Sequence, residues 1–247
     1  DQKIFLSSFT DGDGNKISPS NVYSMAEDKN GVVWCGTEQG PLLFYNSSKI
    51  FDSNYTCTRV KIPRNDGTNL ADYLLQSDKI KAIAIDGANR KWIGTENSGV
   101  FLMSENGQET LQHFTTENSP LLSNDILSIA IRPKNGEVFI GTSNGLVSYQ
   151  SDAAEAGETF GEVRAFPNPV RESYTGEITI AGLVANTQVK ITDVNGNLIY
   201  QTTSNGSLAT WNGKHAGGKK VNTGIYLVLC VNEDGTQSIA TKIMIIN

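Results

Sequence analysis

The sequence is poor in the residues that perform most catalysis and metal binding. Its 247 residues include two histidines and three cysteines. Neither His113 nor His215 has a metal-ligating residue at the short spacings that zinc sites use. The cysteines form no CxxC pair, and we interpret all three as buried packing residues. Because the motifs of serine hydrolases, phosphate-binding loops and zinc proteases are also missing, we predict no enzyme, no metal and no cofactor.

Long apolar runs and clusters of positive charge are missing too. The longest apolar run extends from Ile225 to Val231, far below the roughly 20 residues that a membrane-crossing helix needs. The net charge of −6 and the absence of a Lys/Arg cluster argue against nucleic acid as a partner. What the chain does have is glycine, 24 residues against 7 prolines, which favours short strands joined by tight turns.

Three segments share one pattern: a strand, a polar turn, an aromatic-x-Gly-Thr strand, a second turn and a third apolar strand. They are Ser20–Tyr45, Asp78–Met103 and Asn124–Tyr149, with Gly-Thr pairs at 36/37, 94/95 and 141/142. Successive pairs lie 58 (94 − 36) and 47 (141 − 94) residues apart, and the shorter spacing suits the roughly 40 to 50 residues of a four-stranded propeller blade. Fourth strands are expected at Thr56–Ile62 and Leu111–Thr115, and Lys3–Phe9 is interpreted as the last strand of a preceding blade. Residues 1–150 are therefore predicted to be three four-stranded blades, the C-terminal portion of a larger β-propeller.

Three blades cannot close a ring, because propellers need about four to eight. An open arc exposes unpaired strand edges and apolar faces. We therefore expect missing propeller blades, or another copy of the chain, to cover the open edges. Trp34, Trp92 and Phe139 share one register position and are expected to pack between blades; a ligand-stacking surface is the alternative.

A second module follows a small, acidic linker at residues 151–162. Residues 163–247 alternate between apolar and polar positions, with turns such as DVNGN and NEDGT, and this pattern predicts an immunoglobulin-like antiparallel β-sandwich. Trp211 is expected to cap the sandwich core, with its indole N–H bonded near the turn at Asn212 and Gly213. The whole chain is thus predicted to be all-β.

The DGDGN segment at residues 11–15 has carboxylates at alternate positions, which can ligate calcium. It fails as an EF-hand, since Lys16 stands where glycine is needed and Val22 where a bidentate glutamate is needed. We interpret the segment as a glycine-rich turn between blades, with a weak calcium site of another type as the alternative.

The repeats, with their N-x-V/I…D-x-x-G-x-x-W-x-G-T pattern, resemble the two-component regulator propeller repeats of Bacteroidetes proteins. The segments PNPV (167–170), VKITDVNGNLI (189–199), WNGKHAGGKKVNTGIY (211–226) and the final KIMIIN resemble C-terminal sorting domains of the type IX secretion system and hook-capping-type domains. Together the two modules resemble the C-terminal part of PorZ-like proteins. That resemblance implies an exported protein in the periplasm, at the outer-membrane surface or outside the cell, with secretion-complex proteins or cell-surface glycan and lipopolysaccharide as partners.

Three function hypotheses follow. The first is a non-catalytic exported scaffold that helps attach anionic lipopolysaccharide to cargo, as the resemblance implies. The second is a glycan-sensing periplasmic propeller of a two-component system, and the third is a secreted cargo protein with a sorting domain. A propeller hydrolase or lyase would need acid and base groups from the absent blades.

Any ligand of the blades is expected at the loops before the first strand and between the second and third strands, because loops on rigid scaffolds commonly carry function. Plain solvation of these loops is the alternative. The candidate ligand-binding residues are Asn21, Glu38, Gln39, Asp78, Lys79, Glu96, Asn97, Asn124, Asp125, Ser143 and Asn144.

Overall fold

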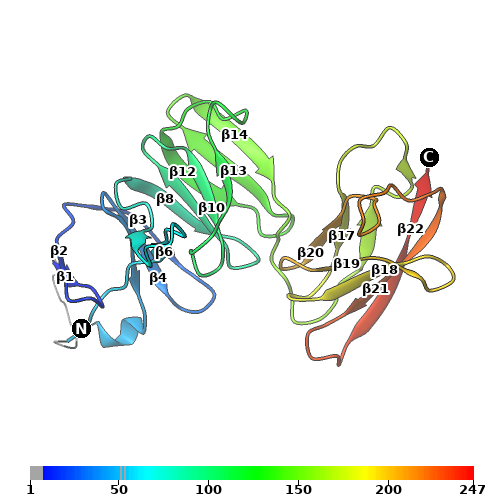
Figure 1. The fold of residues 1–247 in the computed structure, drawn as a ribbon, viewed down its shortest axis with the longest axis horizontal. Helices are drawn as coiled ribbons and strands as arrows, with labels where there is room; N and C mark the ends of the chain where they lie inside the picture. The colour runs from blue at the N-terminus through cyan, green and yellow to red at the C-terminus, as the bar shows by residue number, and fades with distance from the viewer. Residues whose placement is uncertain (1–7, 51, 53) are drawn as a thin grey trace. The chain divides into compact units, whose positions relative to one another are not determined.

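The computed structural model describes residues 8–50, 52 and 54–247, which form two compact units (Figure 1). One unit holds the described residues up to Ile131 together with Val138–Tyr149, and the other holds Arg132–Glu137 with Gln150–Asn247. Almost all regular structure is β; the one helix among the described residues is the 3-10 turn η1 (Ser47–Lys49). The all-β fold class is therefore confirmed. No described helix has the length and apolar character to cross a membrane.

The first unit contains the three repeats as three successive antiparallel sheets. They are β3–β5 (Val22–Glu27, Val33–Thr37, Gly40–Phe44), β8–β11 (Ile80–Ile85, Lys91–Thr95, Val100–Met103, Thr110–Phe114) and β12–β14 (Ile126–Ile131, Glu137–Thr142, Gly145–Gln150). We call these sheets the first, second and third blades. Apolar side chains fill the spaces between them, with Trp34 in the core between the first and second and Trp92 in the core between the second and third.

The number of strands per blade differs from the prediction of four. Only the second blade has a four-stranded sheet in the described residues, with β11 close to the expected Leu111–Thr115. In the first blade the fourth strand is reduced to one bridge between Leu43 and Thr58, and the sheet of the third contains three strands. The strand predicted at Lys3–Phe9 lies mostly outside the described residues; Phe9 itself belongs to β1 (Phe9–Thr10), which pairs with β2 (Lys16–Ile17).

The repeated Gly-Thr pair is explained by a hydrogen bond of the threonine and by the small size of the glycine. The Oγ1 atoms of Thr37, Thr95 and Thr142 donate to the carbonyls of Gly40, Gly99 and Gly145 at 2.7, 2.9 and 3.0 Å, which closes the turn before the third strand of each blade. The preceding glycines leave room for neighbouring strands. A Cβ on Gly94 would lie 2.5 Å from Cγ2 of Ile126 in the next blade, so a larger residue cannot fit without a shift.

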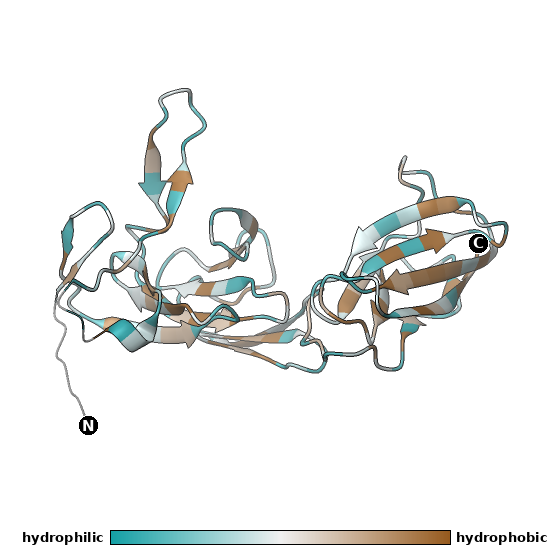
Figure 2. Ribbon diagram, turned by 90° about the horizontal axis from the view of Figure 1, so that it is seen from below, coloured by the Kyte–Doolittle hydropathy of each residue, from teal (hydrophilic) through white to brown (hydrophobic). Residues whose placement is uncertain are grey.

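The long segment between the first two blades carries a hairpin of its own. Strands β6 (Lys61–Pro63) and β7 (Ala71–Tyr73) pair with each other and with no other named strand among the described residues, and the hairpin projects away from the blades (Figure 2).

The second unit is a sandwich of two sheets. One sheet has the order β15-β17-β20 (Arg164–Phe166, Ile178–Ala181, Leu208–Trp211), and the other has β16-β22-β21-β18-β19 (Val170–Arg171, Ser238–Ile246, Gly224–Val231, Gln188–Thr192, Leu198–Thr203). All pairs are antiparallel except β16 with β22, which is parallel. Inward side chains such as Ile180, Val189 and Val228, each fully buried, form one core. Trp211 is buried, and its Nε1 donates to the Lys214 carbonyl at 2.8 Å, so its predicted capping role is confirmed.

The segment between the repeats and the sandwich pairs with the sandwich. Ala154 bridges Gly206, Gly157 bridges Val184, and the Ser207 amide donates to the Ala154 carbonyl at 2.9 Å. The cysteines are free and buried, as predicted: Cys35, Cys57 and Cys230 are 6%, 0% and 1% exposed.

Candidate functional site

The predicted ligand-binding residues lie at one end of the blade sheets, where the loop before the first strand meets the loop after the second. In the first blade the Glu38 carboxylate accepts the amides of Ser20 at 2.5 Å and Asn21 at 3.4 Å. Burial alone would raise the pKa of Glu38, but these backbone hydrogen bonds outweigh it and lower the pKa. Gln39 donates its amide to Thr37, so its backbone is held by the Gly-Thr turn.

In the second blade the same two loops are joined by an ion pair. Lys79 Nζ lies 2.7 Å from Glu96 Oε1, and this bond raises the pKa of Lys79. The same ammonium lies 4.8 Å from the ring centre of Tyr23 in the first blade. Asp78 accepts the Ser98 hydroxyl, and Asn97 is exposed.

The third blade closes its loops with neutral groups. The Ser143 amide donates to the Asp125 carbonyl at 3.0 Å, and the Asn144 side chain donates to Leu122. Asp125 also accepts Lys81 of the second blade at 2.7 Å, while the Asn124 carbonyl accepts the Gly99 amide at 3.1 Å. The structure thus brings the predicted residues of all three blades to one face. Among the charged groups of this set, Lys79 pairs with Glu96, and Asp125 pairs with Lys81, which lies outside the set. Whether this face binds a ligand stays a prediction.

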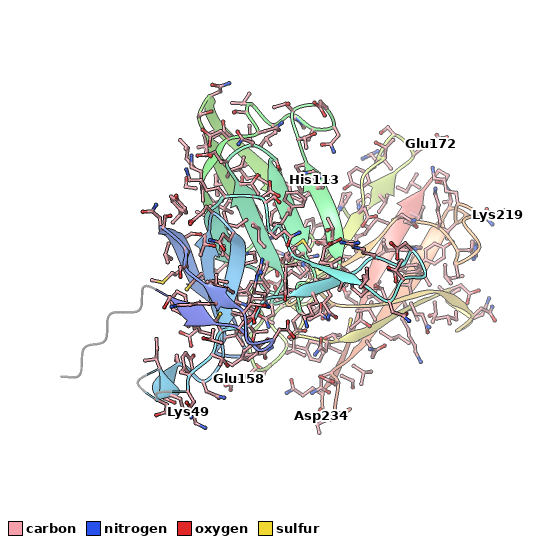
Figure 3. All side chains as sticks on the ribbon, turned by 60° about the vertical axis from the view of Figure 1, so that its left-hand side comes forward. Lys49, His113, Glu158, Glu172, Lys219 and Asp234 are labelled. Carbon is pink, nitrogen blue, oxygen red and sulfur yellow. The ribbon has the colours of Figure 1, made fainter. Side chains whose placement is uncertain are left out.

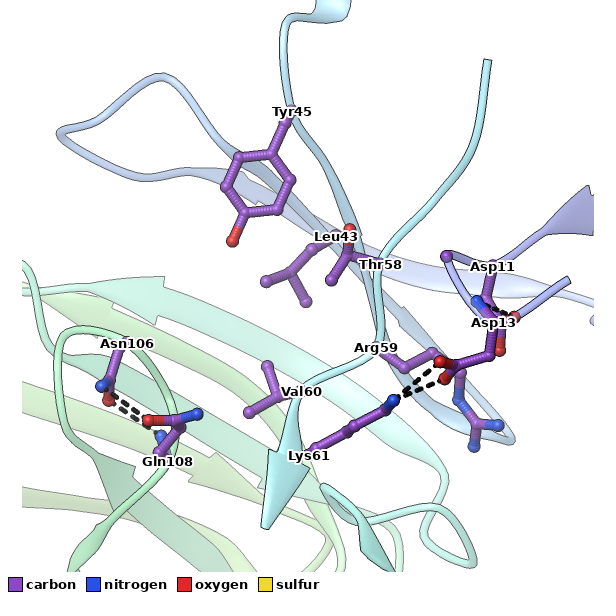
Figure 4. A pocket seen from close by; sticks show the side chains of 11 residues that line it. Asp11, Asp13, Leu43, Tyr45, Thr58, Arg59, Val60, Lys61, Asn106 and Gln108 are labelled. Atoms are coloured by element: carbon purple, nitrogen blue, oxygen red, sulfur yellow. Dashed lines mark hydrogen bonds and ion pairs between the residues drawn. The ribbon is translucent and has the colours of Figure 1, made fainter. Parts of the chain in front are cut away.

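A groove of about 470 Å³ lies elsewhere in the first unit, and the sequence did not point to it (Figure 4). Leu43 and Val60 form its apolar part, and Tyr45, which is 48% exposed, borders it. Asn106 and Gln108 line the opposite side and are hydrogen bonded to each other at 3.1 Å. No motif marks these residues, because four separate segments supply the lining.

The charged part of the groove is built around Asp13. Its carboxylate accepts Lys61 at 2.8 Å and the Tyr73 hydroxyl at 2.9 Å, and these bonds lower the pKa of Asp13. Asp11 uses one oxygen to accept the amides of Asp13 and Asn15, so it closes its own turn as expected of DGDGN. The Arg59 guanidinium stacks on Tyr73 at 3.7 Å and has no ion pair in the part of the chain that the structure describes.

A second groove, of about 430 Å³, shares Tyr45 and Asn106 with the first. At its inner end the fully buried Lys91 ammonium lies 3.0 Å from Asp28 Oδ2. The same carboxylate oxygen accepts the Trp34 indole N–H at 3.0 Å. Burial lowers the pKa of Lys91. Burial would raise the pKa of Asp28, yet the Val32 amide, Lys91 and the indole together lower it.

Neither histidine joins these sites. His113, labelled in Figure 3, stacks on Phe101 with ring centres 3.9 Å apart, and its Nε2 lies 2.7 Å from the Ser98 carbonyl. Within the described ranges, His, Cys, Asp and Glu side chains form no group of three that could hold a metal ion.

Partial propeller blades followed by an immunoglobulin-like sandwich define the class of this protein, and the comparisons with known proteins assign both modules. Residues 164–247 match the family described as the secretion system C-terminal sorting domain, and residues 16–39 match the two component regulator propeller. No curated protein matches the sequence. Among solved structures, the chain is 34% identical to PorZ of Porphyromonas gingivalis, with a TM-score of 0.69.

That alignment covers 99% of this chain and 33% of the PorZ chain, so the chain spans about a third of that relative's length. PorZ is described as an essential bacterial surface component of the type-IX secretion system. The chain therefore combines regulator-type propeller repeats with a type IX sorting-type domain, and it resembles the C-terminal part of PorZ-like proteins.

Two extracellular domains from B. thetaiotaomicron also match. One, from a one component system, is 17% identical with a TM-score of 0.39 and covers 92% of this chain and 31% of its own. The other, from a hybrid two component system, is 14% identical with a TM-score of 0.39 and covers 95% and 52%.

Proposed function

We propose that this protein is an exported, non-catalytic binding protein that acts as a surface component of a type IX secretion system. The observation that carries the proposal is the 34% identity to PorZ over 99% of this chain, across both modules. The sorting-domain match over residues 164–247 supports export and a docking or sorting role for the sandwich.

The finer part of the proposal is that the blades bind the sugar of a cell-surface polysaccharide, such as anionic lipopolysaccharide, for attachment to cargo. The groove beside Tyr45 supports it. An exposed aromatic ring next to the Asn106 and Gln108 carboxamides offers an apolar face and convergent hydrogen-bonding groups to a sugar ring. Arg59, which has no ion pair within the described residues, can meet an acidic group on the sugar.

The export role is tested by deleting residues 163–247 from the full-length protein in its native host. Loss of surface display is expected, because the sandwich is the module that matches a sorting domain. Unchanged display would contradict this role.

The sugar-binding role is tested separately, with purified full-length protein and lipopolysaccharide from the same host. Tyr45→Ala and Arg59→Ala should each weaken binding at least about tenfold. Tyr174→Ala, which removes another exposed tyrosine from the sandwich, should leave binding unchanged. Equal binding by all variants would exclude the groove.

A sensor of a two-component system is the second candidate, and the match of residues 16–39 to the regulator propeller favours it. The two candidates differ in what the gene encodes after this segment. A transmembrane helix and a histidine kinase would support the sensor and contradict the secretion component.

A further inference from the structure

The outer face of the five-stranded sheet in the sandwich is unusually apolar along its central strand. Strand β21 buries Tyr226, Val228 and Cys230 in the core, and its alternate residues point outward. These four, Ile225, Leu227, Leu229 and Val231, are 46%, 36%, 39% and 38% exposed; we call them the β21 stripe. The solvated face of an antiparallel sheet normally carries polar residues, so four exposed aliphatic side chains in line indicate a contact surface.

The register of the sheet shows what borders the β21 stripe. Met244, 46% exposed, pairs with Ile225 on β22, and Ala240 pairs with Leu229, so the apolar surface continues sideways. Lys242 pairs with Leu227 on that side, and Lys190 of β18 pairs with Leu229 on the other side.

The charge on this sheet has one sign. Its five strands contain Arg171, Lys190 and Lys242 but no aspartate or glutamate, although the whole chain carries a net charge of −6. All three cations are exposed, and none forms an ion pair in the described part of the molecule. The face is therefore an apolar row with cations on both sides.

We propose that this face docks onto another protein whose surface presents an apolar row bordered by aspartate or glutamate. The inference rests on the proposed docking role of the sandwich and names the surface and the chemistry of the partner. Acidic side chains would meet Lys190 and Lys242 while the partner's apolar row covers the β21 stripe. Flat sheet faces commonly pack on other sheets in this way.

The same features disfavour two other occupants. A second copy would bring the same face against itself, with lysines and arginine from both copies and no acid to pair with them. A lipid surface is normally contacted through Trp, Tyr and Phe at the interface, whereas the outward residues of β21 and β22 include no aromatic side chain.

The experiment uses the full-length protein in its native host, with a photo-crosslinking residue in place of Leu229. We expect one adduct to a different protein, attached at a peptide where Asp or Glu flanks apolar residues. In the same background, Lys190→Glu with Lys242→Glu should lower the adduct yield at least about tenfold, and the reverse charge change in the partner peptide should restore it. Lys219→Glu, in a turn outside this sheet (Figure 3), is the matched control and should change nothing.

Each contrary result is distinct. An adduct of the chain to itself would replace the proposed partner with a second copy. If the purified protein floats with phosphatidylcholine–phosphatidylglycerol vesicles and the double variant does not, a membrane would replace the proposed partner. An adduct that is insensitive to the double variant, or no adduct, would overturn the proposal outright. If deleting residues 163–247 abolishes display but Leu229 gives no adduct and the double variant is displayed normally, the docking role of the sandwich stands and this face is wrong. Matching melting temperatures show that the variants are folded.

Discussion

The second and third blades have the same topology for three strands but different interiors. In the second blade Asp86, fully buried at the turn, accepts the Trp92 indole N–H at 3.3 Å and Arg90 Nε at 2.7 Å. In the third blade Arg132 begins the equivalent turn and Phe139 occupies the position of the tryptophan. Trp92 is fully buried, whereas Phe139 is half-buried and belongs to no core cluster of the described residues.

This difference shows that the turn aspartate and the tryptophan are one unit. The first blade repeats it, with Asp28 accepting Trp34 at 3.0 Å. A buried carboxylate is costly without donors, and a buried indole N–H is costly without an acceptor. In the third blade phenylalanine replaces the tryptophan, so there is no indole N–H for an aspartate at the turn to accept. The pair is present in the first and second blades, whose tryptophans pack against the following blade, and is missing from the third blade, against which no further blade packs in the described residues.

The largest loss of stability is expected from Asp86→Ala. It removes the carboxylate that pairs with the buried Arg90 Nε and accepts the Trp92 indole N–H. Losing one partner of a buried ion pair typically costs about 3–5 kcal/mol. Urea unfolding should show a loss of this size, whereas Asp13→Ala, at an exposed ion pair, should leave the midpoint unchanged. Equal midpoints for both variants would show that the buried unit does not stabilise the blade.

The packing between blades can be tested at the repeated glycines. A Cβ on Gly94 would press against Ile126 of the third blade, so Gly94→Ala should cost about 1–3 kcal/mol. In the third blade, a Cβ on Gly141 meets Ser128 Oγ at 2.6 Å, an atom that can rotate away. Gly141→Ala should therefore cost less, as measured by thermal unfolding of the two variants. The opposite order would mean that the blades are not packed as described.

The pH dependence of the unfolding free energy tests the contribution of the buried Asp28 carboxylate. The pKa of Asp28 lies below 3.8 in the folded protein, so the unfolded chain takes up this proton more readily. The stability that Asp28 contributes is therefore present above pH 3.8 and is lost as pH falls through the lowered pKa. Between about pH 6 and pH 3 the wild type should lose more unfolding free energy than Asp28→Asn. If urea titrations show that wild type and Asp28→Asn lose equal unfolding free energy over this range, Asp28 does not contribute to the pH dependence.

The smallest effect is expected on the third blade. Leu146 is 66% exposed, so Leu146→Ser should change stability by no more than about 0.5 kcal/mol. Leu102 of the second blade is 2% exposed, and Leu102→Ser should be severely destabilising. A large effect at Leu146 in the full-length protein, but not in this segment, would show that another blade covers it there.

Much of the fold was predictable because its signals are local. Alternating apolar residues and Gly-Thr turns define strands from neighbours in the sequence, and the structure confirms the repeats and the burial of Trp34, Trp92 and Trp211. The fourth strand was less predictable. Of the two segments predicted as fourth strands, Leu111–Thr115 forms most of β11, whereas Thr56–Ile62 contributes only a single bridge at Thr58 to its blade, because pairing depends on the path of the neighbouring chain.

The candidate sites were also only partly predictable from the sequence. The loop residues from Asn21 to Asn144 could be chosen from the repeat, since equivalent positions in equivalent blades must lie at one end. Their partners could not: Lys81 pairs with Asp125 across two blades. The groove beside Tyr45 was missed because Asp13, Lys61 and Asn106 come from segments without a common pattern.

By itself, the sequence determined the all-β class, the order of the two modules and their resemblance to regulator propellers and sorting domains, because strand periodicity and turn chemistry act over a few residues. The tertiary structure alone decided which carboxylates are buried, how the blades share their charges, and that four aliphatic side chains of β21 face outward between lysines. Burial and pairing depend on groups far apart in the chain, and only the folded arrangement brings those groups within contact distance.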